Sequence, residues 1–208
     1  MSVGGGNVVV QGVHYESLMT SKAIFIDKDG TLLRNVPFNV DPDHVELMPG
    51  AIEALRRLEA DGFQLILISN QPGVAFGYFE ETALRFLRTH LTVLLANHGV
   101  HLNDFYWCPH HPKGKLLPYR ANCLCRKPKP GLLLRAAREH SVQISDSWIL
   151  GDILDDVEAG HRAGCRAILI DGGLETEWSL TPLRKPDYIV THLEEAARLI
   201  LAPALVKI

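Results

Sequence analysis

The sequence has 208 residues, of which 47% are hydrophobic and 22% are charged, and its formal net charge is −3. This composition is that of an ordinary globular protein with enough apolar residues to bury a core. The charge balance argues against a nucleic-acid partner, and no apolar run approaches the about 20 residues that span a bilayer. Because the first residues lack the pattern of a secretion signal, we expect a cytoplasmic protein in which residues 1–21 form an extension.

Apolar runs and amphipathic segments alternate along residues 22–208, which we expect to form one domain. The expected strands cover residues 23–27, 64–69, 102–107, 148–151, 166–171 and 187–190. The expected helices cover residues 49–62, 80–97, 130–140, 155–163 and 193–201, and residues 32–48 are expected to form a loop. Strands that alternate with helices predict a mainly parallel sheet covered on both faces, which is a three-layer, Rossmann-like α/β fold.

In such folds, ligands bind outside the carboxyl ends of the strands, so the residues that follow each strand are the candidates for chemistry. These candidates are Asp27 and Asp29 after the first strand, Ser69, Asn70 and Gln71 after the second, and Asp152, Asp155 and Asp156 after the fourth. Two acidic clusters and a group of hydroxyl and amide side chains are therefore expected to meet at one rim of the sheet.

The acidic residues suggest phosphoryl transfer. Asp27 and Asp152 could together hold Mg²⁺, which prefers oxygen ligands and offsets the repulsion between an anionic substrate and an anionic nucleophile. Asp27 could then attack phosphorus to form an aspartyl phosphate, while Asp29 protonates the leaving oxygen and later activates water. Ser69 could donate a hydrogen bond to a phosphoryl oxygen, and a lysine is needed to complete the positive charge.

A simpler explanation is available for each acidic cluster taken alone. An acidic residue at the end of a strand is often a helix N-cap or part of a turn. The occurrence of both clusters in this order, at the ends of two expected strands, favours the catalytic explanation. Lys28, between the two acids, is expected to be a variable position.

A second group of residues indicates a metal site of another kind. Cys108, His110, Cys123 and Cys125 offer the three sulfur ligands and one nitrogen ligand of a closed tetrahedral zinc site. Zinc would close the loop at about 108–127, which has little apolar content of its own. The alternatives are a loop of reduced cysteines, and a site in which the neighbouring His111 replaces His110.

These motifs resemble those of the haloacid dehalogenase (HAD) superfamily of phosphatases. The resemblance rests on Asp-Lys-Asp-Gly-Thr at 27–31, Ser69, Lys127 and the acidic run at 151–156. The stretches SNQPGVAFG, CPHH, CLCRKPKPG and GDILDD are similar to those of the heptose-bisphosphate phosphatases and the related histidinol-phosphate phosphatases. Members of these groups lack a large cap domain and carry a zinc-stapled loop beside the active site.

The resemblance implies a role for each matching residue. Asp27 would be the nucleophile, Asp29 the general acid and base, and Ser69 and Lys127 would stabilise the phosphoryl group. The implied magnesium ligands are Asp27, the main-chain oxygen of Asp29, and Asp152. Substrate contacts are expected from Asn70, Gln71 and Arg126, the last of these beyond the transferred phosphate.

The function that these roles imply is a magnesium-dependent phosphomonoesterase, acting at the 7-position of a heptose 1,7-bisphosphate in the synthesis of bacterial lipopolysaccharide. One departure from the pattern is Ile153, where these phosphatases often carry lysine. One alternative is a histidinol-phosphate phosphatase, although the acidic residue-proline pair expected after the first motif is missing. Another is a zinc-loop binding module without catalysis, which the intact acidic residues argue against. Without a cap domain to close the site, we expect a monomer.

Overall fold

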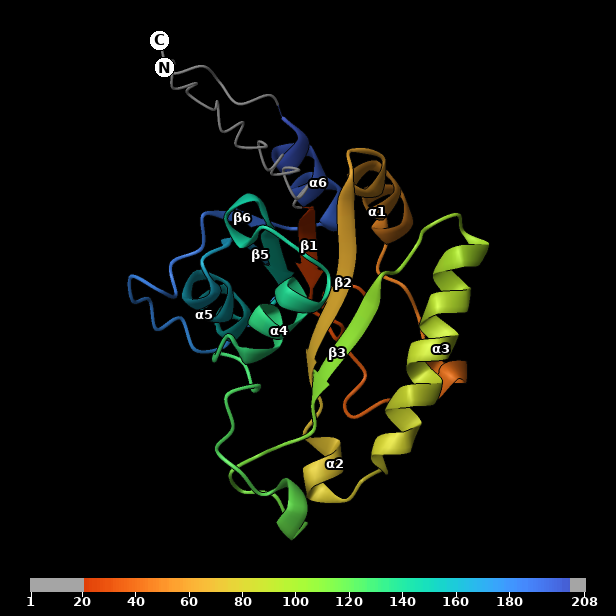
Figure 1. Ribbon diagram of the computed structural model, residues 1–208, viewed down its shortest axis with the longest axis vertical. Coiled ribbons are helices and arrows are strands. Elements are labelled where there is room, and N and C mark those ends of the chain that lie inside the picture. The colour runs from red at the N-terminus through yellow and green to blue at the C-terminus, as the bar shows by residue number, and fades with distance from the viewer. Residues whose placement is uncertain (1–20, 203–208) are drawn as a thin grey trace, which may run out of the picture.

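A computed structural model describes residues 21–202, and the extension expected over residues 1–21 therefore lies almost entirely outside the described residues (Figure 1). Its six strands are β1 (Lys22–Ile26), β2 (Phe63–Asn70), β3 (Asp104–Cys108), β4 (Trp148–Gly151), β5 (Arg166–Ile170) and β6 (Tyr188–Val190). The longer helices are α1 (Ala51–Ala60), α3 (Glu81–Asn97), α4 (Gly131–Glu139), α5 (Leu154–Ala163) and α6 (Leu193–Leu201). The expected alternation of strands and helices is confirmed.

The six strands form one sheet in the order β3-β2-β1-β4-β5-β6, and every neighbouring pair is parallel. The sequence order of the strands reverses between β1 and β4. In doubly wound sheets this reversal leaves a crevice at the carboxyl ends of the two strands, where ligands bind. The fold thus places the residues that follow β1 and β4 at the most favourable position for a site.

Side chains that alternate along the strands build two separate cores. One face of the sheet packs its buried side chains, such as Ile24 and Leu65, against α1, α3 and α6. The other face packs Phe25 and Ile66 against α4 and α5. Figure 1 shows these helices on either side of the sheet, and the predicted three-layer architecture is confirmed.

The structure differs from the expected elements mainly in a short helix and in the exact start of another. The sequence reading missed α2 (Gly73–Phe76), whose single turn is too short to show a helical period. Helix α1 starts at Ala51 rather than at Pro49, because Gly50 at its N-cap has a left-handed backbone with φ of 74°. In the expected loop 32–48 there is one short 3-10 helix, Pro42–His44, and no cap domain is inserted within the described residues.

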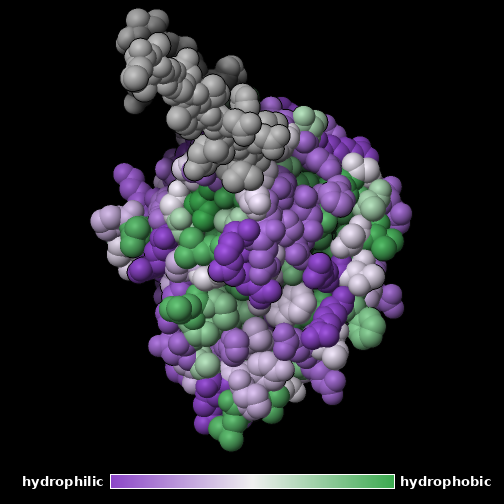
Figure 2. All heavy atoms as spheres, viewed as in Figure 1, coloured by the Kyte–Doolittle hydropathy of each residue, from purple (hydrophilic) through white to green (hydrophobic). Residues whose placement is uncertain are grey.

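The surface is mixed in character. On the face shown in Figure 2, hydrophobic residues lie in separate patches between hydrophilic ones. Among residues 21–202, no helix combines the length and the hydropathy that crossing a bilayer requires.

Candidate active site

The carboxyl ends of β1 and β4 bring two predicted site residues together. Asp27 directly follows β1, and Asp152 directly follows β4. The backbone N–H of Asp27 donates to the Leu150 carbonyl in β4 at 2.9 Å, which links the two strand ends. One carboxylate oxygen from each of Asp27, Asp152 and Asp156 lies within 4.8 Å of the others. Asp156 is fully buried in the first turn of α5. Asp156 belongs to this cluster, although no role was predicted for it. Its position four residues after Asp152 in the GDILDD run was the feature that could have indicated this role.

Two glycines make this close approach possible. A Cβ atom on Gly30 would lie 2.3 Å from Asp152 Oδ2, and its φ of 91° is itself unfavourable for other residues. A Cβ atom on Gly151 would lie 2.3 Å from the Asp156 side chain. The hydroxyl of Thr31 also reaches this cluster and donates to Asp152 Oδ1 at 3.3 Å. Gly30 therefore lets the loop after β1 pack against the Asp152 carboxylate of the other loop, and Gly151 lets the Asp156 carboxylate, five residues along the same segment, fold back against the end of β4.

Lys127 supplies a buried cation to the cluster. Its Nζ atom lies 2.5 Å from Asp27 Oδ1 and 2.5 Å from Asp156 Oδ1, and it donates to the Ile68 carbonyl at 2.8 Å. Burial lowers the pKa of Lys127, but the two carboxylates raise it more, so that the pKa lies above its ordinary value. Lys127 is therefore held as an ammonium ion at the expected phosphoryl position.

Asn70 fixes the backbone that carries this lysine. Its amide group donates from Nδ2 to the Lys127 carbonyl at 3.1 Å and accepts at Oδ1 from the Lys127 N–H at 3.0 Å. Both polar ends of the Asn70 side chain are therefore engaged with protein. The structure therefore gives Asn70 a supporting contact that the sequence did not predict, and its contact with substrate stays a prediction.

Asp29 lies at the mouth of the cluster and is held from two sides. Lys28 Nζ lies 2.5 Å from Asp29 Oδ1, and Gln71 Nε2 donates to Asp29 Oδ2 at 3.0 Å. Gln71 Nε2 also donates to Ser69 Oγ at 2.8 Å, so the amide that we predicted to contact substrate is engaged with two other predicted site residues. Burial raises the pKa of Asp29 above its ordinary value, against an opposing effect of Lys28. The expectation that Lys28 is merely a variable position does not account for its burial.

The acidic cluster fits a hard divalent cation. Three carboxylates and the ammonium group of Lys127 leave a formal charge of −2 in a buried site. All of the donors are oxygen atoms, which Mg²⁺ prefers over sulfur and nitrogen. Asp27 and Asp152 could hold such an ion as predicted, and Asp156 could join them or pair with Lys127.

The same crowding predicts a pH dependence for the metal-free protein. Burial, reinforced by the Asp27 carboxylate, raises the pKa of Asp152 to about 8, while an unfolded aspartate titrates near 3.8. Between these values the folded chain binds a proton that the unfolded chain does not, so stability falls as the pH rises from about 4 to 8. Mg²⁺ must displace this proton, and we expect it to raise the unfolding temperature more at pH 8 than at pH 6.

Thermal unfolding in EDTA and in Mg²⁺ at the two pH values measures this effect. The Asp152→Asn variant, which lacks this carboxylate, is expected to reduce the difference between the two pH values, and the Asp156 carboxyl, whose pKa burial raises to about 7, accounts for what remains. An equal Mg²⁺ effect at pH 6 and pH 8 in the unaltered protein would contradict the raised pKa of the buried carboxyl groups.

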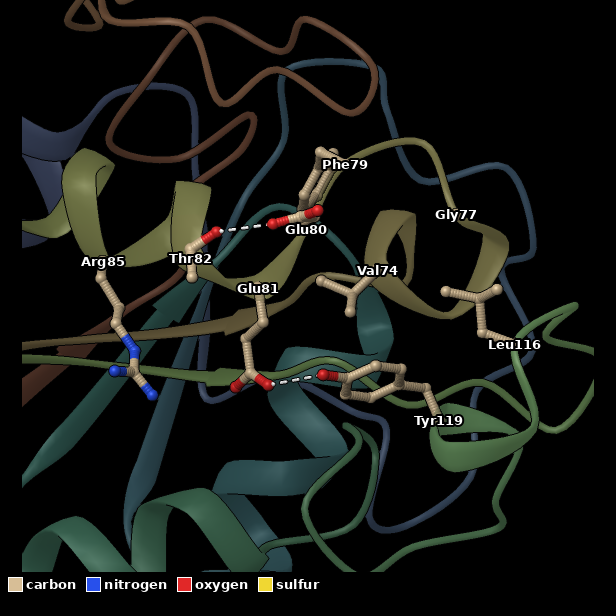
Figure 3. Close-up of a pocket in the computed structure, with 9 residues that line it drawn as sticks. All are labelled: Val74, Gly77, Phe79, Glu80, Glu81, Thr82, Arg85, Leu116 and Tyr119. Carbon is tan, nitrogen blue, oxygen red and sulfur yellow. Dashed lines mark hydrogen bonds between the residues drawn. The ribbon is translucent and has the colours of Figure 1, made fainter.

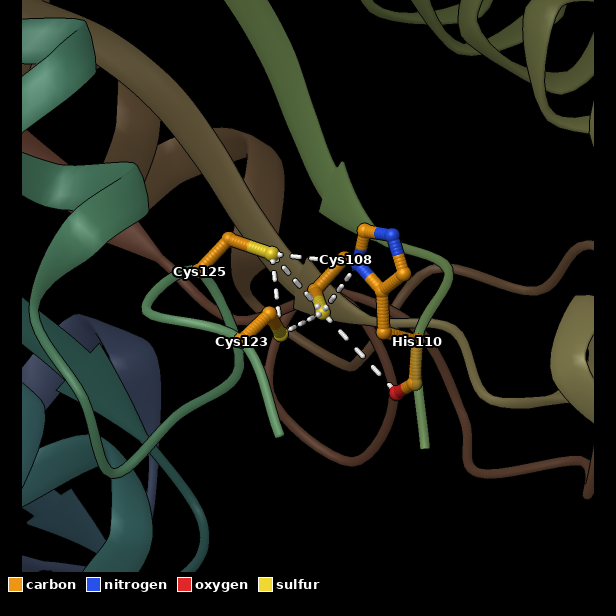
Figure 4. Close-up of side chains that lie close together, drawn as sticks. All are labelled: Cys108, His110, Cys123 and Cys125. Carbon is orange, nitrogen blue, oxygen red and sulfur yellow. Dashed lines mark hydrogen bonds between the residues drawn. The ribbon is translucent and has the colours of Figure 1, made fainter. Parts of the chain in front are cut away.

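The predicted zinc ligands also lie together (Figure 4). The Sγ atoms of Cys108, Cys123 and Cys125 are 3.2 to 3.5 Å apart, and His110 Nδ1 is 3.3 Å from Cys125 Sγ. These separations exceed the S–S bond of about 2.05 Å in a disulfide. They approach the edge of about 3.8 Å that a tetrahedron with Zn–S bonds of about 2.3 Å requires.

One thiol of this cluster is readily deprotonated, as binding of a metal cation requires. The hydrogen bond with Cys108 lowers the pKa of the Cys125 thiol to about 5, and the same contact raises the pKa of Cys108. A thiolate is the form of cysteine that binds metals. The chemistry and spacing of the four donors therefore fit zinc, and His110 rather than His111 completes the set.

A cavity of about 530 Å³ lies beside α2 and the start of α3 (Figure 3). Glu81 on its wall accepts hydrogen bonds from Tyr119 at 3.1 Å and from Trp107 at 3.0 Å. These bonds tie α3 to the cysteine loop and to β3. None of the predicted catalytic residues lines this cavity, so we assign it no part in the chemistry.

The parallel α/β sheet, with an acidic loop after β1 and a second one after β4, is the arrangement of a HAD-like hydrolase. A family model described as HAD-hydrolase-like matches residues 124–196. D-glycero-beta-D-manno-heptose-1,7-bisphosphate 7-phosphatase of Pasteurella multocida is 43% identical over 142 residues, which are 68% of this chain and 77% of that protein. The protein of the same name from Photorhabdus laumondii is 36% identical over 181 residues, covering 86% of this chain and 89% of its own.

A solved structure extends the similarity to three dimensions. The D,D-heptose 1,7-bisphosphate phosphatase of B. bronchiseptica, crystallised with magnesium and phosphate, superposes with a TM-score of 0.74 at 28% identity. The match covers 86% of this chain and 98% of that one. The chain belongs to this family of HAD-like phosphatases, which are phosphoric monoester hydrolases. The family and the enzyme class predicted from the motifs are confirmed.

Proposed function

We propose that the protein is a magnesium-dependent phosphatase that removes the 7-phosphate of D-glycero-D-manno-heptose 1,7-bisphosphate through an aspartyl phosphate on Asp27. The observation that carries the reaction is the meeting of Asp27 with Asp152 and Lys127 at the carboxyl ends of β1 and β4. The observation that carries the substrate is the name shared by relatives 43% and 36% identical to the chain.

The predicted catalytic residues divide the steps of this reaction among them. The Asp27 carboxylate attacks phosphorus, and the P–O bond to the sugar breaks as Asp29 gives its proton to the leaving oxygen. Asp29 then accepts a proton from the water that hydrolyses the aspartyl phosphate. Lys127 and Ser69 stabilise the charge on the phosphoryl oxygens. Magnesium held by Asp27, the main-chain oxygen of Asp29, and Asp152 would neutralise this charge further.

We propose that Arg126 contacts the part of the substrate beyond the transferred phosphate. It directly precedes Lys127, and its Nη1 atom is buried without a hydrogen-bond partner among residues 21–202. A hollow of about 230 Å³ lies at this point and is also lined by Lys127 and Lys129. A second phosphate of a bisphosphate would supply the missing acceptor for Arg126. Asp155 also lines this hollow, and Ile153, where related phosphatases often carry lysine, adds no cation nearby.

We also propose that zinc occupies the cluster of Cys108, His110, Cys123 and Cys125. The closed set of four ligands leaves no open position, which is typical of a structural site. Because Arg126 and Lys127 directly follow Cys125, the metal would fix the backbone that presents both cations. The zinc would thereby support catalysis without contact with the substrate.

Zinc content gives a direct prediction. We expect about one zinc per chain in the purified protein, separate from the catalytic magnesium. The Cys125→Ser variant should lose this zinc, and its loss of the loop geometry should lower the turnover. Cys165, which is buried at 4% exposure away from the cluster, provides the matched control, and Cys165→Ser should keep the metal. Elemental analysis that finds no zinc, with freely reactive loop thiols, would refute the proposal.

The substrate is tested by comparing two phosphate esters. We expect Mg²⁺-dependent release of phosphate from heptose 1,7-bisphosphate, with phosphorus NMR showing the loss of the 7-phosphate. Histidinol phosphate, the substrate of the alternative function, should be turned over far more slowly. A preference for histidinol phosphate would overturn the proposed substrate but keep the reaction, whereas no turnover of either ester would support the binding module without catalysis.

We further propose that residues 22–208 act as one catalytic domain. Both cores of the described residues use the same six-stranded sheet, and every predicted site residue comes from this unit. The monomeric state, the cytoplasmic location and the lack of a nucleic-acid partner stay predictions.

A further inference from the structure

Lys28 is one of two lysines that are buried among residues 21–202, and the reaction described above does not use it. Its side chain is 1% exposed, although it lies between two acidic residues in the loop after β1. The other buried lysine, Lys127, pairs with Asp27 and Asp156. Burying an ammonium group costs several kcal/mol unless it is paired, so its position requires a partner.

The partner of Lys28 is Asp29. The Nζ atom lies 2.5 Å from Asp29 Oδ1, while its other contact, with the Asn39 carbonyl, is long at 3.5 Å. Each of the two acids in the loop after β1 therefore pairs with its own buried lysine. Lys127 serves the nucleophile, and Lys28 serves the general acid and base.

A second contact completes the hold on Asp29. Gln71 Nε2 donates to Asp29 Oδ2 at 3.0 Å, so each carboxylate oxygen is held by a different side chain. Each oxygen of a carboxyl group has two lone pairs, and a lone pair remains for the proton that is transferred. Lys28 and Gln71 thus fix the plane of the carboxyl group without blocking its chemistry.

We propose that Lys28 is a positioning residue that aims the carboxyl group of Asp29 at the leaving oxygen of the substrate. The inference deepens the proposed function and rests on it. Proton transfer requires the acid to lie within hydrogen-bond reach of the leaving oxygen, and small displacements of a catalytic group are costly. Without Lys28, the Asp29 side chain would be held by Gln71 alone.

A positioning role for Lys28 affects substrates unequally, which a purely structural role does not. A sugar alkoxide leaves poorly and needs a proton in the transition state, whereas p-nitrophenolate is stable without one. General acid catalysis typically contributes about 10²–10⁴-fold. Loss of Lys28 should therefore slow the sugar phosphate strongly and p-nitrophenyl phosphate little.

The experiment compares kcat for heptose 1,7-bisphosphate and p-nitrophenyl phosphate in matched variants. Lys28→Met keeps an apolar side chain of similar length, and we expect it to lower kcat about 10- to 100-fold on the sugar but less than about threefold on the aryl ester. Lys28→Arg should recover much of the lost rate. Lys22→Met, which removes a surface lysine paired with Asp61 at 2.7 Å, should change neither rate.

Equal loss on both esters, or no loss on the sugar phosphate, would overturn the role of Lys28. Thermal unfolding identifies a variant that has lost its fold, in which case Lys28→Gln carries the same comparison. If the unaltered enzyme acts on another alkyl phosphate instead of the heptose, that ester takes its place, and only the proposed substrate fails. If the unaltered enzyme hydrolyses no ester, the proposed function itself fails, and the role of Lys28 with it.

Discussion

The Asp27→Asn variant is expected to lose turnover by at least about 10⁴-fold while it keeps its fold and its zinc. An amide cannot form the aspartyl phosphate, and it is a weaker magnesium ligand than a carboxylate. The substitution changes no volume and removes one charge from a crowded acidic site, so unfolding is not expected to explain the loss. Steady-state phosphate release, with circular dichroism and thermal unfolding of the same sample, measures both parts of the prediction.

The control for this variant removes a carboxylate elsewhere. Asp61 is exposed at the end of α1 and pairs with Lys22, so Asp61→Asn should leave the rate unchanged. Turnover of Asp27→Asn at a rate near that of the unaltered protein would refute Asp27 as the nucleophile. It would leave the fold and the family membership untouched.

The second large effect is expected from Lys127→Met. This substitution leaves the Asp27 and Asp156 carboxylates without their shared cation in a buried site. Breaking a buried ion pair by removing one partner costs about 3–5 kcal/mol, and the charge that stabilises the phosphoryl oxygens is lost as well. We expect kcat to fall about 10³-fold and the unfolding temperature of the metal-free protein to drop.

Lys127→Arg separates charge from geometry. The guanidinium group is larger and planar, and it does not fit between two oxygen atoms that each lie 2.5 Å from Nζ. We therefore expect little recovery of activity from this variant, in contrast to Lys28→Arg. Near-normal turnover of Lys127→Met would contradict the electrostatic role of this lysine, and Lys22→Met again controls for the loss of a lysine.

Much of this site follows from the strand pattern of the sequence. Short apolar runs that end in Asp27 and Asp152 predict two parallel strands, and parallel strands present their carboxyl ends at one edge. The cysteine and histidine spacing likewise predicted a cluster that the structure brings together. These features depend on the order of the strands along the chain and on the spacing of residues, both of which can be read from a sequence.

The remaining features depend on side-chain direction, which a sequence does not display. Lys28 lies between two acids, and nothing in its neighbours shows that it is buried against Asp29. Asn70 and Gln71 were predicted to contact substrate, and the bonds of their amides to Lys127 and Asp29 were not predicted. Asp156 could as well have been a helix cap, and only its distance to Asp27 places it in the cluster. Their contacts are set by tertiary packing.

The most direct test of the account is to look for the phosphoryl group on the protein. The enzyme is mixed with heptose 1,7-bisphosphate and Mg²⁺, quenched in acid within the first turnover, and examined by mass spectrometry of its peptides. We predict one added phosphoryl group on the peptide that contains Asp27, and none in Asp27→Asn. Rapid hydrolysis of substrate with no phosphorylated peptide at any quench time, or with the group on another residue, would contradict the account.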